Sequence, residues 1–267
     1  MGGPLMEKHF ETPDPITLDL RVPAGSVEVT ATETTTTDVG IEPLNGPARD
    51  SLDKLVVSLE GSRLRLEVPQ ARMSLGRSPE YAITVRCPLG SEVKLRGAST
   101  DLVGRGRLGG VEVKTASGDA LVEEVDGDLR SDSASGDVRA ETVTGTVEIR
   151  TASGDLSVRR AVGPVKAQSV SGDVEIGASE SRLEVQTVSG DLRAQRIAGG
   201  PVSVNAVSGD VEVAVAPGAA VWLDLRSLSG DMRSDLDAGD GPAEGESVLE
   251  IRGKTVSGDV RVRRASS

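Results

Sequence analysis

The segment SGDLSVRRAVGPVKAQSV, residues 153–170, is one full repeat of this 267-residue chain and decides its fold. Apolar and polar residues alternate after the Ser-Gly-Asp tripeptide, as Leu-x-Val, and again after the second glycine, as Val-x-Ala. Alternation with a period of two is typical of a β-strand that buries one face. Each 18-residue unit is therefore predicted to hold two strands and two corners, built as two nine-residue half-units.

The Ser-Gly-Asp tripeptide recurs eight times. Its copies begin at Ser117, Ser135, Ser153, Ser171, Ser189, Ser208, Ser229 and Ser257. The first four steps between copies are 18 residues long, and the later ones are 19, 21 and 28. A repeat of this length predicts a solenoid in which each unit forms one coil and stacks on its neighbours.

Stacking places residues one unit apart above one another, about 4.8 Å apart. Two such columns are aliphatic throughout: Val138, Leu156, Val174 and Leu192, and Val111, Leu129, Val147, Val165 and Leu183. A third column carries hydroxyl groups, which we expect to face inward and to form hydrogen bonds: Thr115, Ser133, Thr151, Ser169 and Thr187. We therefore predict an all-β protein that folds as a single-stranded parallel β-solenoid.

One column of outward-facing residues changes the sign of its charge at every step. It consists of Glu112, Arg130, Glu148, Lys166 and Glu184. Opposite charges that face each other across neighbouring strands are stabilising, and like charges are destabilising. This alternation has a physical reason only if the coils stack in an 18-residue register.

The regular repeats do not span the whole chain. We predict an N-terminal tail at 1–15, irregular β-strands that cap the solenoid at 16–98, and regular repeats at 99–267 with an acidic loop at 235–246. The last unit ends abruptly, so the C-terminal coil is predicted to be an exposed edge that meets a protein partner or another copy. Trp222 is expected to plug a widened end of the solenoid.

Composition excludes several classes of protein. The chain has one histidine, His9, and one cysteine, Cys87, too few for a zinc site of these ligands and for an internal disulfide. A net charge of −12 argues against nucleic-acid binding. No apolar run approaches the ~20 residues of a membrane span, so no direct membrane insertion is expected. The single thiol and the absence of a visible export signal favour a cytoplasmic location.

The aspartates of the repeat form the one column of like charges. They are Asp119, Asp137, Asp155, Asp173, Asp191 and Asp210. Carboxylates stacked this closely repel each other by about 1 kcal/mol in water, so another interaction must offset the repulsion. The first interpretation is that each aspartate accepts hydrogen bonds at its corner. The alternative is a ladder that binds a divalent cation such as Ca²⁺, which prefers oxygen ligands.

The repeated S-G-D-[VL]-x-[VA] unit and the opening HFETPDPITLDLRVPAGSVEVTA, residues 9–31, resemble a bacterial family of unknown function. This family is known as "putative adhesin" or β-strand-repeat proteins and is related to Toastrack-type domains. The resemblance implies a right-handed β-helix, carries over no catalytic residue, and places members near genes of envelope stress and membrane-linked signalling.

We therefore predict a protein that is not an enzyme and has no cofactor. Its predicted function is that of a scaffold or interaction protein with an unknown protein partner, linked by family resemblance to envelope-stress or membrane-associated signalling. The alternative is an adhesin-like module that binds a glycan or divalent cations.

Overall fold

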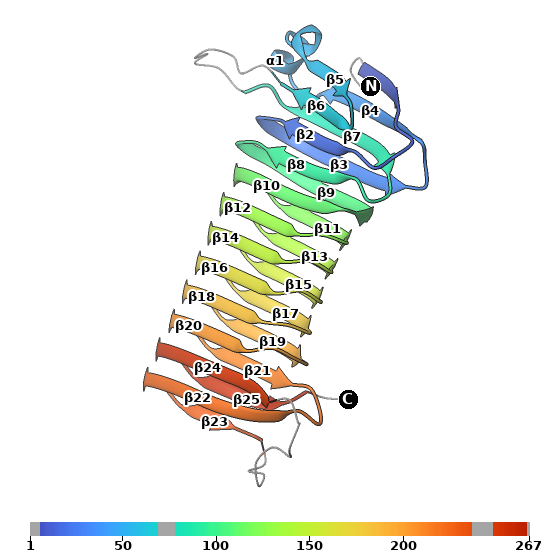
Figure 1. Cartoon of the computed structure of the whole chain (residues 1–267). Helices are drawn as coiled ribbons and strands as arrows, with labels where there is room; N and C mark the ends of the chain where they lie inside the picture. Colours follow the sequence, from blue (N-terminus) through green and yellow to red (C-terminus); the bar gives the residue numbers. More distant parts are fainter. Residues whose placement is uncertain (1–5, 69–77, 237–247, 266–267) are drawn as a thin grey trace. The chain divides into compact units, whose positions relative to one another are not determined.

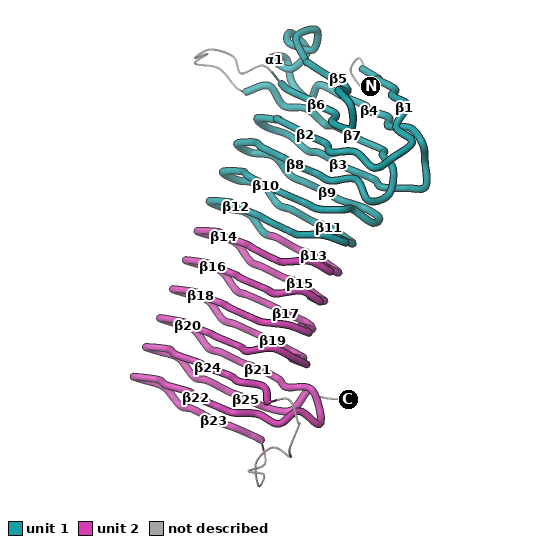
Figure 2. Tube along the Cα trace, viewed as in Figure 1, with its two compact units in different colours: residues 1–137 teal, residues 138–267 magenta. Residues whose placement is uncertain are grey.

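The computed structural model describes residues 6–68, 78–236 and 248–265 (Figure 1). Strands make up 70% of the structure and helices 3%, and the strands form a parallel β-solenoid. The predicted fold class is confirmed, while the handedness stays a prediction. The chain divides into two compact units, residues 1–137 and 138–267 (Figure 2). This division differs from the boundary that we expected at residue 98, where the regular repeats begin.

The first unit contains two parallel sheets with added antiparallel strands. Its elements are β1 (Met6–Glu11), β2 (Thr17–Arg21), β3 (Ala24–Thr32), β4 (Thr36–Pro43), α1 (Gly46–Arg49), the 3₁₀ turn η1 (Leu52–Lys54), β5 (Val56–Glu60), β6 (Arg63–Glu67), β7 (Tyr81–Pro88), β8 (Glu92–Arg96), β9 (Ser99–Leu108), β10 (Gly110–Ser117), β11 (Ala120–Val125) and β12 (Leu129–Ser135). The parallel strands run β6-β2-β8-β10-β12 in one sheet and β7-β3-β9-β11 in the other.

Antiparallel strands cover the outermost coil of this unit. β5 pairs with β6, β4 pairs with β7, and β1 pairs with β4. β1 lies within the segment 1–15 that we expected to be a tail. Because these strands occupy the edges of β6 and β7, the end of the stack in this unit has no open strand edge at those positions.

The second unit consists of coils of two parallel strands each. Its strands are β13 (Val138–Val143), β14 (Val147–Ser153), β15 (Leu156–Ala161), β16 (Val165–Ser171), β17 (Val174–Ser179), β18 (Leu183–Ser189), β19 (Leu192–Ile197), β20 (Val202–Ser208), β21 (Val211–Val215), β22 (Ala220–Ser229), β23 (Met232–Ser234), β24 (Val248–Ser257) and β25 (Val260–Arg264). Most of the predicted acidic loop, 237–246, lies outside the described residues.

Side chains stack in the predicted register. Leu156 pairs with Val138 on one side and Val174 on the other, and all three side chains are buried. Glu148 lies beside Lys166, and Lys166 lies beside Glu184, as the alternating charges predict. The same alternation places Glu112 opposite Arg130 within the first unit.

Glycine is required at the corner of each repeat. Gly172 has a φ of +125°, and a Cβ atom added there would lie 2.2 Å from the carbonyl oxygen of Gly154 in the adjacent coil. The same collision recurs at Gly190, where a Cβ would lie 2.1 Å from the carbonyl oxygen of Gly172. Any larger residue would therefore combine an unfavourable backbone conformation with a clash between coils.

The inward hydroxyl groups form hydrogen bonds within each coil. Thr151 Oγ1 donates to the carbonyl of Ser153 at 3.0 Å, and Ser133 Oγ donates to the carbonyl of Ser135 at 2.7 Å. Each hydroxyl thus satisfies a corner carbonyl two residues ahead. The expected inward, hydrogen-bonded role of this column is confirmed. Thr115 Oγ1 donates to the carbonyl of Ser117 in the same coil and also lies 3.3 Å from the carbonyl oxygen of Ala98 in the adjacent coil.

The last coil in the sequence is not the last coil in the stack, so our expectation of an exposed C-terminal coil is wrong. β24 pairs with β20 on one side and with β22 on the other, and β25 likewise lies between β21 and β23 (Figure 1). The first coil behaves in the same way, because β2 lies between β6 and β8, and β3 between β7 and β9. Both terminal coils are therefore held by neighbours on two sides.

Trp222 does not plug the solenoid, contrary to our expectation. Its side chain is on the outward face of β22 and is 47% exposed. The guanidinium carbon of Arg252 lies 5.9 Å from the centre of the indole ring, within the range of a cation–π contact. Outward-facing tryptophan can therefore be accommodated without widening the interior.

The corner glycines give a direct test of the stacking. Gly172→Ala should lower the free energy of unfolding by roughly 2 kcal/mol or more, because backbone strain and the collision with Gly154 add together. Gly61→Ala is the matched control, since Gly61 also has a positive φ, +59°, but has open space at its Cβ position. Its cost should be about 1 kcal/mol. Equal losses for the two variants in urea unfolding would contradict the close approach of the coils.

Candidate functional site

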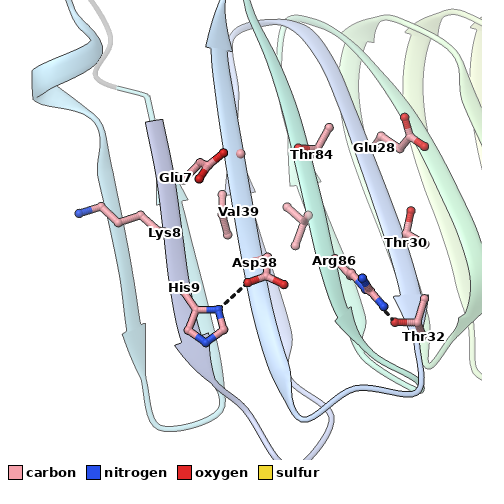
Figure 3. A pocket seen from close by; sticks show the side chains of 12 residues that line it. Glu7, Lys8, His9, Glu28, Thr30, Thr32, Asp38, Val39, Thr84 and Arg86 are labelled. Carbon is pink, nitrogen blue, oxygen red and sulfur yellow. Dashed lines mark hydrogen bonds and ion pairs between the residues drawn. The ribbon is translucent and has the colours of Figure 1, made fainter. Parts of the chain in front are cut away.

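A shallow groove of about 820 Å³ lies on the outer face of the first unit. Its lining residues come from β1, β3, β4 and β7 (Figure 3): Glu7, Lys8, His9, Glu28, Thr30, Thr32, Asp38, Val39, Gly40, Thr84, Val85 and Arg86. The register places Gly40 opposite Thr84, and Thr84 opposite Glu28. The groove is hollow here because small residues meet in the middle of an outward face whose other side chains are longer.

Charged groups of both signs border this outer groove. His9 Nδ1 lies 2.5 Å from Asp38 Oδ1, and His9 Nε2 lies 3.5 Å from Glu11. On the other side, Arg86 Nε donates to Thr32 Oγ1 at 3.3 Å (Figure 3). The hydrogen bond to Asp38 raises the pKa of His9 above its usual value, because the carboxylate stabilises the imidazolium form. The groove therefore offers donors and acceptors to a polar, hydroxyl-rich ligand.

The single thiol takes no part in this groove. Cys87 is buried, and burial raises the pKa of its thiol to about 11. The thiolate is the nucleophilic form of cysteine, so this side chain is inert at neutral pH. His9, in contrast, is exposed on β1, where its imidazole contacts the carboxylates of Asp38 and Glu11.

The aspartate column uses its carboxylates to bind the backbone of the next coil. Asp155 Oδ1 accepts the backbone N–H of Asp173 at 2.9 Å, and Asp173 Oδ1 accepts that of Asp191 at 2.8 Å. The same contact joins Asp101 to Asp119, Asp119 to Asp137, Asp191 to Asp210, Asp210 to Asp259, and Asp259 to Asp231. A charge-assisted hydrogen bond at each step offsets the repulsion between neighbouring carboxylates.

This ladder follows the order of the coils in space, since Asp259 lies between Asp210 and Asp231. Each step brings two aspartates together. Among residues 6–68, 78–236 and 248–265, no group of three or more histidine, cysteine, aspartate or glutamate side chains is arranged to hold a metal ion. The hydrogen bonds supply a structural reason for the ladder, and cation binding stays a hypothesis.

An apolar stripe runs along the outside of the second unit and was missed by the sequence analysis. It consists of the residue that precedes Ser-Gly-Asp in five coils: Val170, Val188, Val207, Val256 and Leu228. Their exposed fractions run from 45% at Val188 to 83% at Leu228. The register of the flanking serines stacks them coil upon coil in that order. The signal was present in the sequence, because outward valine at a fixed repeat position has no role in the core.

The column beside the apolar stripe is uncharged in three of its coils. Gln168, Gln186 and Asn205 occupy successive coils there, and Gln168 Nε2 donates to Gln186 Oε1 at 3.3 Å. In the preceding coil this column holds Arg150, which donates to Gln168 Oε1. Lys254 and Arg226 continue this column beside Val256 and Leu228, so the column is neutral only in the coils of Val170, Val188 and Val207.

No helix among the residues that the structure places is both long and apolar enough to cross a membrane.

The aspartate ladder can be tested by removing one carboxylate. Asp173→Ala should lower the free energy of unfolding by about 1–2 kcal/mol, because the N–H of Asp191 loses its acceptor. Asp173→Asn should restore most of this loss, since the amide oxygen still accepts. Thermal unfolding of the wild type should not change on addition of millimolar CaCl₂. A calcium-dependent rise that Asp173→Asn abolishes would contradict the structural role and support cation binding.

The single histidine allows a clean test of the groove. NMR titration of the imidazole should give a pKa for His9 above 6.5, and Asp38→Asn should lower it. A raised folded-state pKa means that protonation of His9 favours the folded contact with Asp38. The contribution of this contact to the free energy of unfolding is therefore complete below the unfolded-state pKa and is lost as pH rises through the folded-state pKa. An unchanged pKa in the Asp38→Asn variant would show that the two side chains do not interact in solution.

Comparisons with known proteins place the chain. No curated protein matches it. Among solved structures, a "putative adhesin" from Parabacteroides distasonis is similar with a TM-score of 0.54, 11% identity and 97% of each chain covered. A second "putative adhesin", from Parabacteroides merdae, has a TM-score of 0.52, 10% identity and 96% of each chain covered. At these identities the likeness shows the fold alone. The Toastrack DUF4097 family model matches residues 26–182 and 165–263, and the chain belongs to this family.

Proposed function

We propose that this chain is a non-catalytic scaffold that binds a protein partner along the apolar stripe. The observation that carries the proposal is the exposure of four valines and a leucine that stack in successive coils, whereas other exposed apolar side chains, such as Val56 and Leu121, lie outside this column. Exposure of clustered apolar groups to water is unfavourable, and the free energy falls when a partner covers them. Single exposed apolar residues need no such explanation, but an ordered column of five does.

The chemistry of the surface defines the partner. The apolar stripe and its neutral neighbours Gln168, Gln186 and Asn205 form one face of a regular parallel sheet. Such a face suits a protein surface with apolar side chains at its centre and amide or hydroxyl groups around them. On the same face Lys166 and Glu184 form an ion pair with each other, so a charge placed over the central valines would lose hydration without gaining a partner. We therefore propose a partner face that is uncharged at its centre.

The test compares three baits in native cells. The first is the wild type, and the second carries Val188→Asp and Val207→Asp in the apolar stripe. The control carries Val56→Asp and Leu121→Asp, which are exposed to a similar extent, 48% and 45%, but lie outside the stripe. Affinity capture with quantitative mass spectrometry should identify a protein that the wild type and the control retain. The stripe variant should lose it at least tenfold.

The captured protein is then purified and titrated against the same three proteins. The same order of affinities would support the proposal. If no captured protein distinguishes the stripe variant from the control, the apolar stripe is not the binding surface and the proposal fails. The finer prediction, that the partner belongs to envelope-stress or membrane-linked signalling in the cytoplasm, rests on the identity of that protein.

The outer groove favours a second candidate function, an adhesin-like module that binds a glycan. Its hydroxyl groups and charges of both signs can form hydrogen bonds with a sugar. A glycan array would separate the two functions. Binding by the wild type that Arg86→Ala abolishes and that the stripe variant retains would favour the glycan module. Absence of glycan binding would leave the scaffold.

A further inference from the structure

The coil formed by β22 and β23 exposes both a strand edge and the apolar interior. Among the residues that the structure describes, β22 pairs with β24 alone and β23 with β25 alone. The inward residues Val221, Leu223 and Leu225 are only half-buried, whereas Ile251, the neighbour of Leu223 in β24, is 1% exposed. Met232, whose neighbour Val260 is also buried, is 49% exposed.

An edge of this kind is usually covered or made unsuitable for pairing. In the first unit, β6 and β7 carry antiparallel strands on their outer edges. β22 has no such strand among the described residues, and it lacks the proline, the bulge or the run of like charges that would discourage pairing. The composition of β22 is therefore compatible with pairing to a further strand.

We infer that a second copy of this chain pairs with this edge, so that two solenoids join end to end through β22 about a two-fold axis. A two-fold axis makes the contact antiparallel and brings each residue opposite its counterpart in reverse order. This joins two open apolar interiors into one. Leu228 belongs to both surfaces. The inference does not rest on the proposed function, because Val188→Asp and Val207→Asp alter only the apolar stripe, whereas Asp224→Arg and Arg226→Asp alter only the strand edge.

Charge complementarity selects one register for the contact. The outward side chains of β22 are Trp222, Asp224, Arg226 and Leu228, in that order. With Leu225 on the two-fold axis, Asp224 lies opposite Arg226 of the second copy, and Arg226 lies opposite Asp224 of the second copy. Trp222 then lies opposite Leu228 of the second copy. A shift in either direction places Asp224 or Arg226 opposite itself, which is destabilising.

The connecting segment 237–247 is a poorer occupant of this edge. Its sequence, DAGDGPAEGES, has four acids, three glycines and one proline, and it contains no valine, leucine, isoleucine, methionine or aromatic residue. Glycine, proline and aspartate are depleted in strands, and no apolar side chain larger than alanine or proline is present to cover Leu223 or Leu225. A second copy, in contrast, offers the same apolar residues in return.

The edge coil spans 15 residues, 220–234, which is fewer than the ~20–30 residues per partner of a standard interface. We therefore expect a reversible dimer with a dissociation constant of roughly micromolar order. The wild type should move from monomer to dimer with increasing concentration in sedimentation velocity. No larger species should form, because the two-fold contact occupies the β22 edge of both copies.

Charge reversal tests the register. Arg226→Asp alone and Asp224→Arg alone should each weaken the dimer about tenfold or more, since each places like charges together at two symmetric contacts. The double variant Asp224→Arg/Arg226→Asp should restore the wild-type affinity, because the opposite charges face each other again. Circular dichroism and thermal unfolding would show that all three variants are folded. A dimer that does not respond to either single variant would overturn the inference.

A cysteine on the two-fold axis gives an independent readout. Leu225→Cys should form an intermolecular disulfide on mild oxidation, because the two cysteines face each other, while the native Cys87 is buried. Ser203→Cys, on the outward face of β20, is the control and should remain monomeric. A wild type that stays monomeric at all concentrations overturns the inference. If replacing 237–247 by a Gly-Ser linker then produces a dimer, the segment itself is the occupant.

Discussion

The constraint on which this structure depends is the backbone register between coils. Parallel hydrogen bonds hold each strand directly beside the same position of its neighbour, so every choice of residue is repeated once per coil. A corner that brings the carbonyl of Gly154 to 2.2 Å from the Cβ position of Gly172 accepts only glycine. An interior two strands wide accepts valine, leucine, isoleucine and alanine. Each coil must meet the same conditions, so the same residue types recur once per repeat.

The like-charged aspartates show how the same register resolves a conflict. Stacked carboxylates repel, yet each one here accepts the backbone N–H of the next coil, as Asp173 does from Asp191. That hydrogen bond is directional and occurs at every step, whereas the repulsion between exposed carboxylates is screened by water and salt. The alternating charges of the strands also stabilise the same register, but each exposed ion pair contributes less than an aspartate hydrogen bond.

The regular part of the fold could be predicted from the sequence because its signals are periodic. The aliphatic columns, the inward hydroxyls and the alternation around Glu148 each follow from counting in steps of one repeat. The order of the terminal coils could not be predicted, because β22 and β24 both satisfy the inward pattern, and nothing local distinguishes which one lies against β20. The outer groove escaped prediction for a similar reason. Gly40 and Thr84 are far apart in sequence, and only the antiparallel pairing of β4 and β7 brings them together.

Placing a late segment between two earlier coils has a physical consequence for both ends. A last coil in the sequence that also lay last in space would be free to fray, whereas β24 and β25 are held on both sides. The cost is that the coil of β22 and β23 becomes the outermost one of its unit and carries the exposed apolar groups. The strand edge that we assign to a second copy thus follows from the order of the last coils, whereas the apolar stripe already begins at Val170 within the regular repeat.

The order of the coils is tested most directly by chemical crosslinking of paired cysteines. Ser203 and Arg252 are register partners, and Asp224 is one coil further away. A short thiol-specific crosslinker should join the two positions in the variant Ser203→Cys/Arg252→Cys and should fail to join them in Ser203→Cys/Asp224→Cys. The opposite result, rapid crosslinking between positions 203 and 224 and none between 203 and 252, would contradict the stacking described here.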